Sequence, residues 1–162
     1  MGTGKTTVGQ LLSEKLRRQL IDLDTEIEAE SKMTISDIFA AYGEARFRQM
    51  ETEMTIKVSN NNGMIISTGG GIVLREENMT HLRGNSIIVC LMASPETILN
   101  RVSGNDDRPL LKVDNPLQKI HELLDYRRPF YEKADLVINT DDMTPEMVAE
   151  EIIAKNQVLR YD

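Results

Sequence analysis

Short apolar runs alternate along this chain with longer segments in which apolar residues recur at helical spacing. The runs that predict buried strands span residues 20–24, 64–67, 86–92 and 136–138. The segments that predict helices span residues 5–18, 25–32, 34–60 and 141–155, with a break near Tyr42 and Gly43 and a further helix start at 94–96. This alternation is typical of an α/β fold built on a parallel sheet.

Composition and charge narrow the classes of protein to which the chain can belong. Its 162 residues fit one domain spanning 1–162, and 40% of them are apolar, enough for a core. A net charge of −7 gives no fold-wide basic field of the kind that gathers nucleic acid. No apolar run approaches the ~20 residues of a membrane helix, and the first residues lack a secretion signal. The lone Cys90 excludes an intrachain disulfide, so we expect a cytoplasmic protein without nucleic-acid or membrane partners.

The first residues contain the second half of a phosphate-binding loop. Gly2, Thr3, Gly4, Lys5 and Thr6 match the end of the pattern G-x-x-x-x-G-K-[ST]. Glycine lets backbone N–H groups turn inward around a phosphate, and the following helix adds its positive end. In this pattern Lys5 reaches the β- and γ-phosphates, and the Thr6 hydroxyl binds Mg²⁺. The pattern's first glycine and preceding strand are not in the sequence, and a glycine-rich disordered N-terminus is the alternative interpretation.

Two aspartates follow the first predicted strand. Asp22 and Asp24 are two residues apart, so on a strand their side chains would share a face. Ligands of open α/β sheets bind beyond the carboxyl ends of the strands. Phosphoryl transfer needs one carboxylate near the metal and another near the attacking hydroxyl. The alternative is that Asp24 only caps a helix that opens at Thr25.

Arginines and glycines elsewhere suggest an anionic substrate. Arg48 lies in a helical segment, where a solvated surface arginine is the alternative. Gly69, Gly70 and Gly71 directly follow a predicted strand, and three glycines there are explained best by backbone that passes close to a ligand rather than by a plain turn.

Two later segments add further positive charge. The polar stretch 103–111 contains Arg108 and is typical of a mobile loop that closes over a nucleotide and brings a cation to the transferred phosphate. Arg127 and Arg128 precede Pro129, and an arginine fork is the preferred partner of a carboxylate.

The ordered set of these motifs resembles the shikimate kinase family, which is similar to nucleoside monophosphate kinases. The resemblance runs through nearly the whole chain. It rests on the phosphate loop, Asp22-Leu23-Asp24, Phe47-Arg48, Gly69-Gly70-Gly71, Arg108-Pro109-Leu110-Leu111 and the segment from Arg127 to Tyr131. It implies a three-layer P-loop kinase fold with about five parallel strands in the order 2-3-1-4-5. It also implies transfer of phosphate from Mg-ATP to the 3-hydroxyl of shikimate, on the way to aromatic amino acids.

The resemblance also implies roles for individual residues. The residues implied in ATP binding are Gly2, Thr3, Gly4, Lys5, Thr6, Thr7, Arg101 and Arg108. The catalytic residues implied are Lys5, Asp24 and Arg108. Those implied in metal binding are Thr6 and, through water, Asp22. The residues implied in shikimate binding are Asp24, Arg48, Gly69, Gly70, Gly71 and Arg127, with Ile35, Phe39, Phe47, Pro109 and Leu110 as an apolar wall. The implied lid spans about 103–115, the implied substrate-binding segment about 25–60, and the protein is expected to be a monomer.

The sequence departs from the family at the first strand. In the family this strand lies between those predicted at 64–67 and 86–92. Its absence would leave a slot about 10 Å wide with unpaired backbone on both sides. We therefore expect that the natural protein starts upstream of Met1.

Two other functions are compatible with parts of the pattern. A related kinase of gluconate or a similar sugar acid would share the phosphate loop but would not need Arg48 and Arg127 on one carboxylated ring. A non-catalytic nucleotide-fold protein is the second alternative, because half of the loop pattern is missing.

Overall fold

The computed structural model of the protein describes residues 2–102 and 113–159 and contains two pairs of parallel strands. Strand β1 (Leu20–Asp22) pairs with β2 (Ile65–Ser67), and β3 (Val89–Met92) pairs with β4 (Leu136–Asn139). The strands are short and rich in β-branched or other apolar residues, as expected for partly buried strands. The predicted α/β class and the four predicted strands are confirmed.

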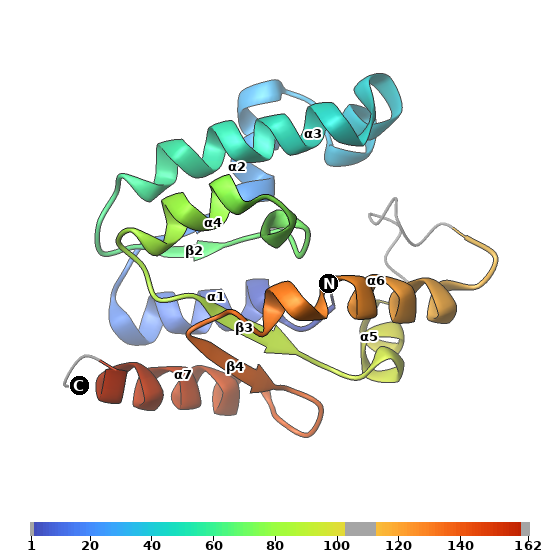
Figure 1. Ribbon diagram of the computed structural model, residues 1–162. Coiled ribbons are helices and arrows are strands. Elements are labelled where there is room, and N and C mark those ends of the chain that lie inside the picture. Colours follow the sequence, from blue (N-terminus) through green and yellow to red (C-terminus); the bar gives the residue numbers. More distant parts are fainter. Residues whose placement is uncertain (1, 103–112, 160–162) are drawn as a thin grey trace.

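The helices account for most of the remaining chain (Figure 1). They are α1 (Lys5–Leu16), α2 (Leu23–Ser31), α3 (Ile35–Ser59), the 3₁₀ turn η1 (Ile72–Leu74), α4 (Glu76–Arg83), α5 (Pro95–Val102), α6 (Pro116–Tyr131) and α7 (Pro145–Leu159). Helices α4 and α6 were not predicted. Helix α4 is mostly polar, and α6 contains Pro129 in its last turn, where the missing N–H disturbs little of the helix.

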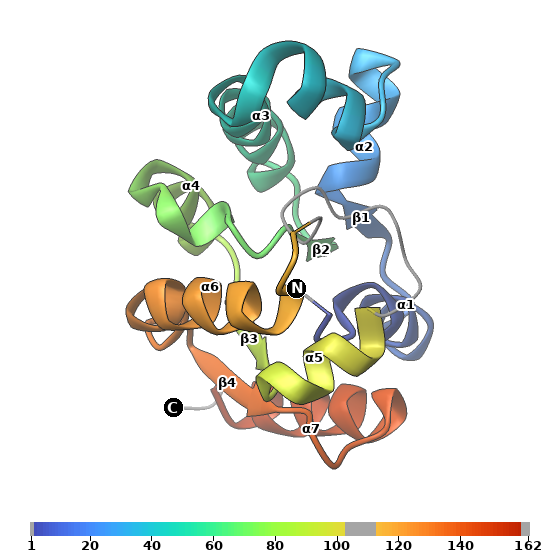
Figure 2. The ribbon, with the colours of Figure 1, turned by 90° about the vertical axis from the view of Figure 1, so that its right-hand side faces the viewer.

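Helices cover both faces of the strands. In Figure 2, α4 and α6 lie on one side of the line of strands, and α1 and α7 lie on the other. Helix α1 buries Val8 and Leu12 in a cluster with Ile138 of β4 and Val148 of α7. This packing fixes the axis of α1, and with it the position of the glycine-rich residues that precede the helix.

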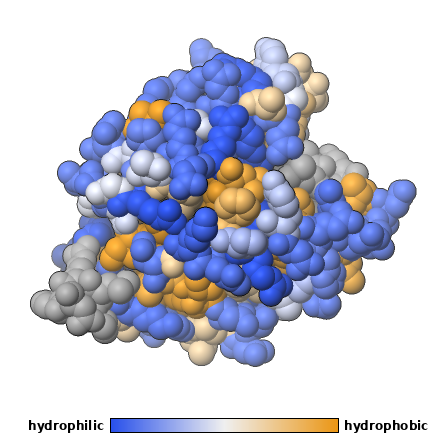
Figure 3. Space-filling model, in the orientation of Figure 1, coloured by the Kyte–Doolittle hydropathy of each residue, from blue (hydrophilic) through white to orange (hydrophobic). Residues whose placement is uncertain are grey.

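The two strand pairs do not join into one sheet within the described residues. The facing edges of β2 and β3 have no strand partner there, and a cavity of about 630 Å³ lies between them, lined in part by Val8, Ile66 and Cys90. Figure 3 shows the molecule from the same side as Figure 1, with hydrophobic side chains gathered across the middle of that side and hydrophilic side chains around them. The expected single sheet of about five strands is therefore present only as two parallel pairs, which are the pairs that the order 2-3-1-4-5 gives on either side of its first strand.

Helix α3 is bent at Gly43, where a break was predicted. The backbone angles of Gly43 are φ 76° and ψ 172°, which are not helical. Ile38 before the bend and Phe47 after it are both buried in the same apolar cluster, together with Leu23 and Ile27 of α2. The bend lets both halves of α3 pack against α2, so it shapes the wall of the site described below.

Part of the expected lid, 103–112, lies outside the described residues, and so do Arg108, Pro109 and Leu110. Among the helices that the structure describes, none is both long enough and apolar enough to cross a bilayer.

Gly43→Ala should lower the free energy of unfolding by about 1–3 kcal/mol, because an alanine at this φ and ψ is strained. A Cβ added at Gly43 would meet no heavy atom within 4 Å, so any cost comes from the backbone alone. Urea unfolding of the variant and the unchanged protein measures the difference.

Gly84→Ala is the matched control. Gly84 has right-handed helical angles of φ −54° and ψ −36° at the end of α4, so alanine there should leave stability unchanged or raise it by about 0.4–1 kcal/mol. Equal stability of both variants would contradict the assigned strain at Gly43.

Candidate active site

The chain before α1 forms a glycine turn at the N-terminus of the helix. Gly2 and Gly4 have φ angles of 63° and 87°, which favour glycine strongly. The Val8 N–H donates to the Gly4 carbonyl at 2.9 Å in the first bond of α1, so the N–H groups of the helix residues before Val8 have no carbonyl partner within the helix and lie at its positive end. A Cβ at Gly2 would lie 2.8 Å from Val102 Cγ1. Glycine is therefore required at this position by packing as well as by conformation.

The two aspartates lie at the junction of β1 and α2. Strand β1 ends at Asp22, whose Oδ1 accepts hydrogen bonds from the N–H groups of Asp24 and Thr25 at 3.1 and 3.3 Å. Asp22 is therefore the helix cap, and Asp24 belongs to the first turn of α2. The expectation that both side chains share one face of a strand was wrong, because the strand ends at Asp22, earlier than predicted. The capping role considered for Asp24 belongs to Asp22.

Arg48 is held on the side of the pocket formed by α3. Its Nη1 donates to Oε2 of Glu51 at 2.9 Å, and Glu51 is buried, with 1% of its surface exposed. Its Nε and Nη2 donate to Oε1 of Glu44 at 3.2 and 3.1 Å. A Cβ at Gly71 would lie 2.5–2.6 Å from three atoms of the guanidinium group. The absence of a side chain at Gly71 therefore lets Arg48 lie against the glycine segment.

Arg127 reaches the pocket from α6 and is buried, with 5% of its surface exposed. Its Nε has no hydrogen-bond partner among the described residues. Close by in the chain, the Tyr131 hydroxyl donates to the Gly70 carbonyl at 2.7 Å and ties the glycine segment to α6. A buried guanidinium group with an unsatisfied N–H is costly unless a ligand completes its bonding, and this favours an anionic ligand.

Arg101 lies at another border of the same pocket. Its Nη1 donates to the Thr140 hydroxyl at 2.9 Å and its Nη2 to the Thr140 carbonyl at 2.7 Å. These bonds tie the end of α5 to the segment after β4.

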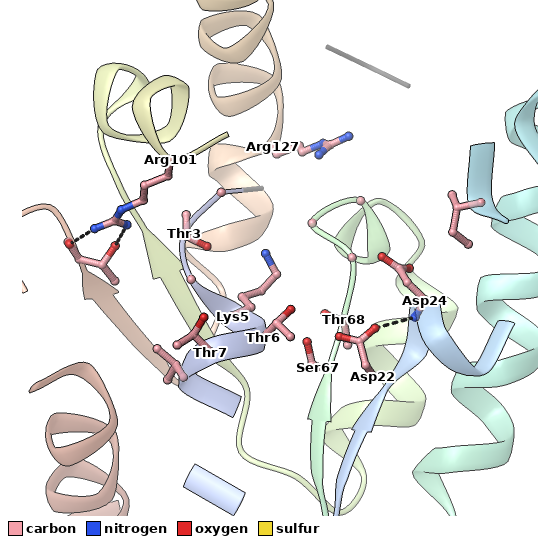
Figure 4. A pocket seen from close by; sticks show the side chains of 18 of the residues that line it. Thr3, Lys5, Thr6, Thr7, Asp22, Asp24, Ser67, Thr68, Arg101 and Arg127 are labelled. Atoms are coloured by element: carbon pink, nitrogen blue, oxygen red, sulfur yellow. Dashed lines mark hydrogen bonds between the residues drawn. The ribbon is translucent and has the colours of Figure 1, made fainter. Parts of the chain in front are cut away.

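All of the predicted site residues that the structure describes line one pocket of about 540 Å³ (Figure 4). Lys5 from α1, Asp24 from α2 and Arg127 from α6 project into the same space. The predicted residues that line it are Gly2, Thr3, Gly4, Lys5, Thr6, Thr7, Asp22, Asp24, Ile35, Phe39, Phe47, Arg48, Gly69, Gly70, Gly71, Arg101 and Arg127. Arg108, Pro109 and Leu110 lie outside the described residues.

Charges of both signs are concentrated in this pocket. Burial raises the pKa of the Asp24 carboxyl, and the neighbouring Asp22 carboxylate raises it further, while Lys5 and Arg48 act in the opposite direction. Burial also raises the pKa of Glu51, although Arg48 opposes this. A raised pKa is typical of a carboxylate that acts as a general base.

Sequence reasoning missed the two acids that hold Arg48. Glu44 and Glu51 lie four residues before and three residues after Arg48, so they share its face of the helix. This spacing could have identified both residues. The burial of Glu51 could not have been found from spacing, because it depends on the packing of α3 against the glycine segment.

The fold and the site together define a P-loop kinase for a small anionic acceptor. The family model for shikimate kinases matches residues 1–157. A shikimate kinase of Thermodesulfovibrio yellowstonii is 48% identical over 159 residues, which cover 98% of this chain and 92% of that protein. One of Caldicellulosiruptor bescii is 49% identical, with coverage of 95% and 90%. A solved shikimate kinase of Acinetobacter baumannii in complex with shikimate superimposes with a TM-score of 0.96 at 36% identity, covering 100% of this chain and 91% of that one. The chain belongs to the shikimate kinase family, whose members are ATP-dependent phosphotransferases.

Asp24→Asn should raise the free energy of unfolding at pH 7. Because the pKa of Asp24 in the folded protein lies above its ordinary value of 3.8, the folded state binds the proton more tightly than the unfolded chain, and stability falls as the pH rises from 3.8 through the raised pKa. The neutral amide avoids this loss. Urea unfolding should show the gain at pH 7 and none below pH 3.8; a variant that is less stable at pH 7 would contradict the assigned pKa direction.

Proposed function

We propose that this protein transfers the γ-phosphoryl group of ATP to the 3-hydroxyl of shikimate, giving shikimate 3-phosphate and ADP for aromatic amino acid biosynthesis. The observation that carries the proposal is a single pocket that joins an anion-binding helix N-terminus to an acid with a raised pKa and to two arginines. The pocket thus offers sites for a polyphosphate, for a hydroxyl and for a carboxylate. Shikimate combines the last two groups on one ring.

The phosphate end of the pocket is supplied by α1. The amides around Gly4 and the first turn of the helix bind phosphate oxygens, and Lys5 neutralises charge at the transferred group. Asp24 orients the attacking hydroxyl and accepts its proton, since burial keeps its affinity for a proton high. Arg101 of α5, which is held by Thr140 at the border of the pocket, contacts the adenine in this proposal.

The carboxylate end of the pocket is supplied by α3, α6 and the glycine segment. Arg48 and Arg127 bind the substrate carboxylate from two elements, and the backbone at Gly70 adds a contact that Tyr131 holds in place. Ile35, Phe39 and Phe47 form an apolar wall for the ring. The rings of Phe39 and Phe47 pack with their centroids 4.9 Å apart, which makes this wall rigid.

The residues present also fit a magnesium ion. Mg²⁺ prefers oxygen ligands and keeps several of its waters, so it needs few protein side chains when phosphates are bound. Thr6 and Asp22 both line the pocket, and Asp22 uses Oδ1 alone for its two capping bonds. No cluster of three acidic, histidine or cysteine ligands occurs among the described residues, which suits an ion held by nucleotide phosphates, Thr6 and the hydrated Asp22. Bound there, Mg²⁺ would neutralise charge on the phosphates.

We further propose that the protein is a monomer with a single domain. A lid over about 103–115 brings Arg108, Pro109 and Leu110 to the substrates. The strands belong to one five-stranded sheet in the order 2-3-1-4-5. This sheet is supported by the parallel pairing of β1 with β2 and of β3 with β4.

A coupled assay for ADP, with shikimate and gluconate offered separately, tests the function. We expect turnover with shikimate and none with gluconate, because the arginines together with the apolar wall suit a carboxylate that is carried on a ring, whereas gluconate is an open-chain acid. Turnover of gluconate alone would overturn the choice of substrate. Absence of turnover with either compound would favour a non-catalytic nucleotide-binding protein.

Arg127→Ala should raise the KM for shikimate by about tenfold to a hundredfold, because the loss of a hydrogen bond to a charged group costs about 1.5–3 kcal/mol of binding free energy. It should change kcat less, because the carboxylate contact is present in both ground and transition states. Arg128→Ala is the matched control, since Arg128 is exposed and pairs only loosely, at 3.5 Å, with Asp125. Unchanged shikimate affinity of the Arg127 variant in calorimetry would refute the clamp.

A further inference from the structure

The two acidic partners of Arg48 use different edges of its guanidinium group. Glu51 binds Nη1 at 2.9 Å. A single oxygen of Glu44 accepts from both Nε and Nη2, at 3.2 and 3.1 Å. The edge formed by Nε and Nη2 is a two-pronged fork of the kind that binds a carboxylate. The carboxylate of Glu44 therefore occupies the fork that Arg48 would offer to a ligand.

The inner pair with Glu51 is built to persist. Only 1% of the Glu51 surface and 11% of the Arg48 side chain are exposed, and breaking such a buried pair is costly because it leaves a charge without a partner. Gly71 lies directly against the guanidinium group and limits its movement. With Nη1 fixed in this way, the fork of Nε and Nη2 remains the edge that can exchange partners.

The outer pair with Glu44 is built to exchange. The Glu44 side chain is 51% exposed, and ion pairs at exposed positions contribute little stability. Glu44 also follows Gly43 directly, so it lies beside the bend in α3 rather than inside a regular helix. A ligand carboxylate that enters the pocket can therefore displace Glu44 without disturbing Glu51.

We propose that Glu44 is an internal carboxylate competitor that occupies the ligand-binding fork of Arg48 and is displaced by the carboxylate of the substrate. The proposal rests on the proposed function, in which Arg48 binds that carboxylate. In this role Glu44 sets the affinity of the pocket for acids and its selectivity between acids and compounds that lack a carboxylate. A compound without a carboxylate leaves the pair of Glu44 and Arg48 intact, whereas an acid must compete with it.

Calorimetric titration of shikimate into the Glu44→Gln variant tests the proposal. Removal of the competing charge should lower the Kd about twofold to threefold, the range set by exposed helical ion pairs. Glu44→Ala, which also removes the acceptor oxygen, should lower the Kd at least as much.

Glu53→Gln is the matched control for general charge effects. Glu53 lies on the same helix, its side chain is 54% exposed, and it pairs with Arg46 at 3.6 Å instead of with Arg48. It should leave the Kd for shikimate unchanged. A ring triol that lacks the carboxylate should bind the Glu44→Gln variant and the unchanged protein equally.

Arg48→Ala in the same titration separates the two proposals. If it leaves shikimate affinity unchanged, the proposed carboxylate clamp fails and the competitor fails with it. If it weakens binding but Glu44→Gln behaves like Glu53→Gln or also weakens binding, the clamp stands and the competitor is refuted. Tighter binding by Glu44→Gln alone, absent with the triol, supports the competitor.

Discussion

The whole site depends on where the N-terminus of α1 lies. Its positive end attracts an anion only if the helix axis points into the pocket, and the apolar cluster that Val8 and Leu12 form with β4 and α7 holds the axis in that direction. Loop glycines with positive φ bring the chain back over the helix end. Because the carboxyl ends of β1 and β2 lie beside this helix end, Asp24 and the glycine segment line the same pocket as the first residues of α1.

The pocket is also a balance of charges that are costly to bury alone. Asp24 and Glu51 both have a raised pKa because burial disfavours their charged forms; Lys5 and Arg48 oppose this at Asp24, and Arg48 and Arg127 oppose it at Glu51. For Arg48 itself, burial acts to lower the pKa, but the attraction of Glu51 and the hydrogen bonds to Glu51 and Glu44 outweigh burial and raise it. The site is thus organised before any ligand binds, which is the arrangement expected where electrostatic stabilisation supplies most of the catalysis. Such organisation lowers folding stability.

The agreement between sequence and structure is good where the chain itself limits the options. Strands were found where short apolar runs occur, and the bend in α3 falls at Gly43, which alone can take that backbone conformation easily. Helices α4 and α6 were missed, since the first has few apolar residues and the second contains Pro129. Asp24 was expected on the first strand or as a helix cap, but Asp22 is the cap and Asp24 lies in α2, because a shift of two residues in the end of a strand cannot be read from hydrophobic pattern.

The sequence by itself determined the class of fold, the phosphate loop and the family, because these depend on glycine conformation, on apolar spacing and on an ordered set of motifs. Only the tertiary structure decided which side chains meet. Glu51 is buried beneath Arg48, and Tyr131 bonds to Gly70 across 61 residues of chain. The bond from Tyr131 joins elements that are distant in sequence, and the burial of Glu51 depends on how α3 packs against the glycine segment. Local pattern carries no information about that packing, since residue spacing describes one element at a time.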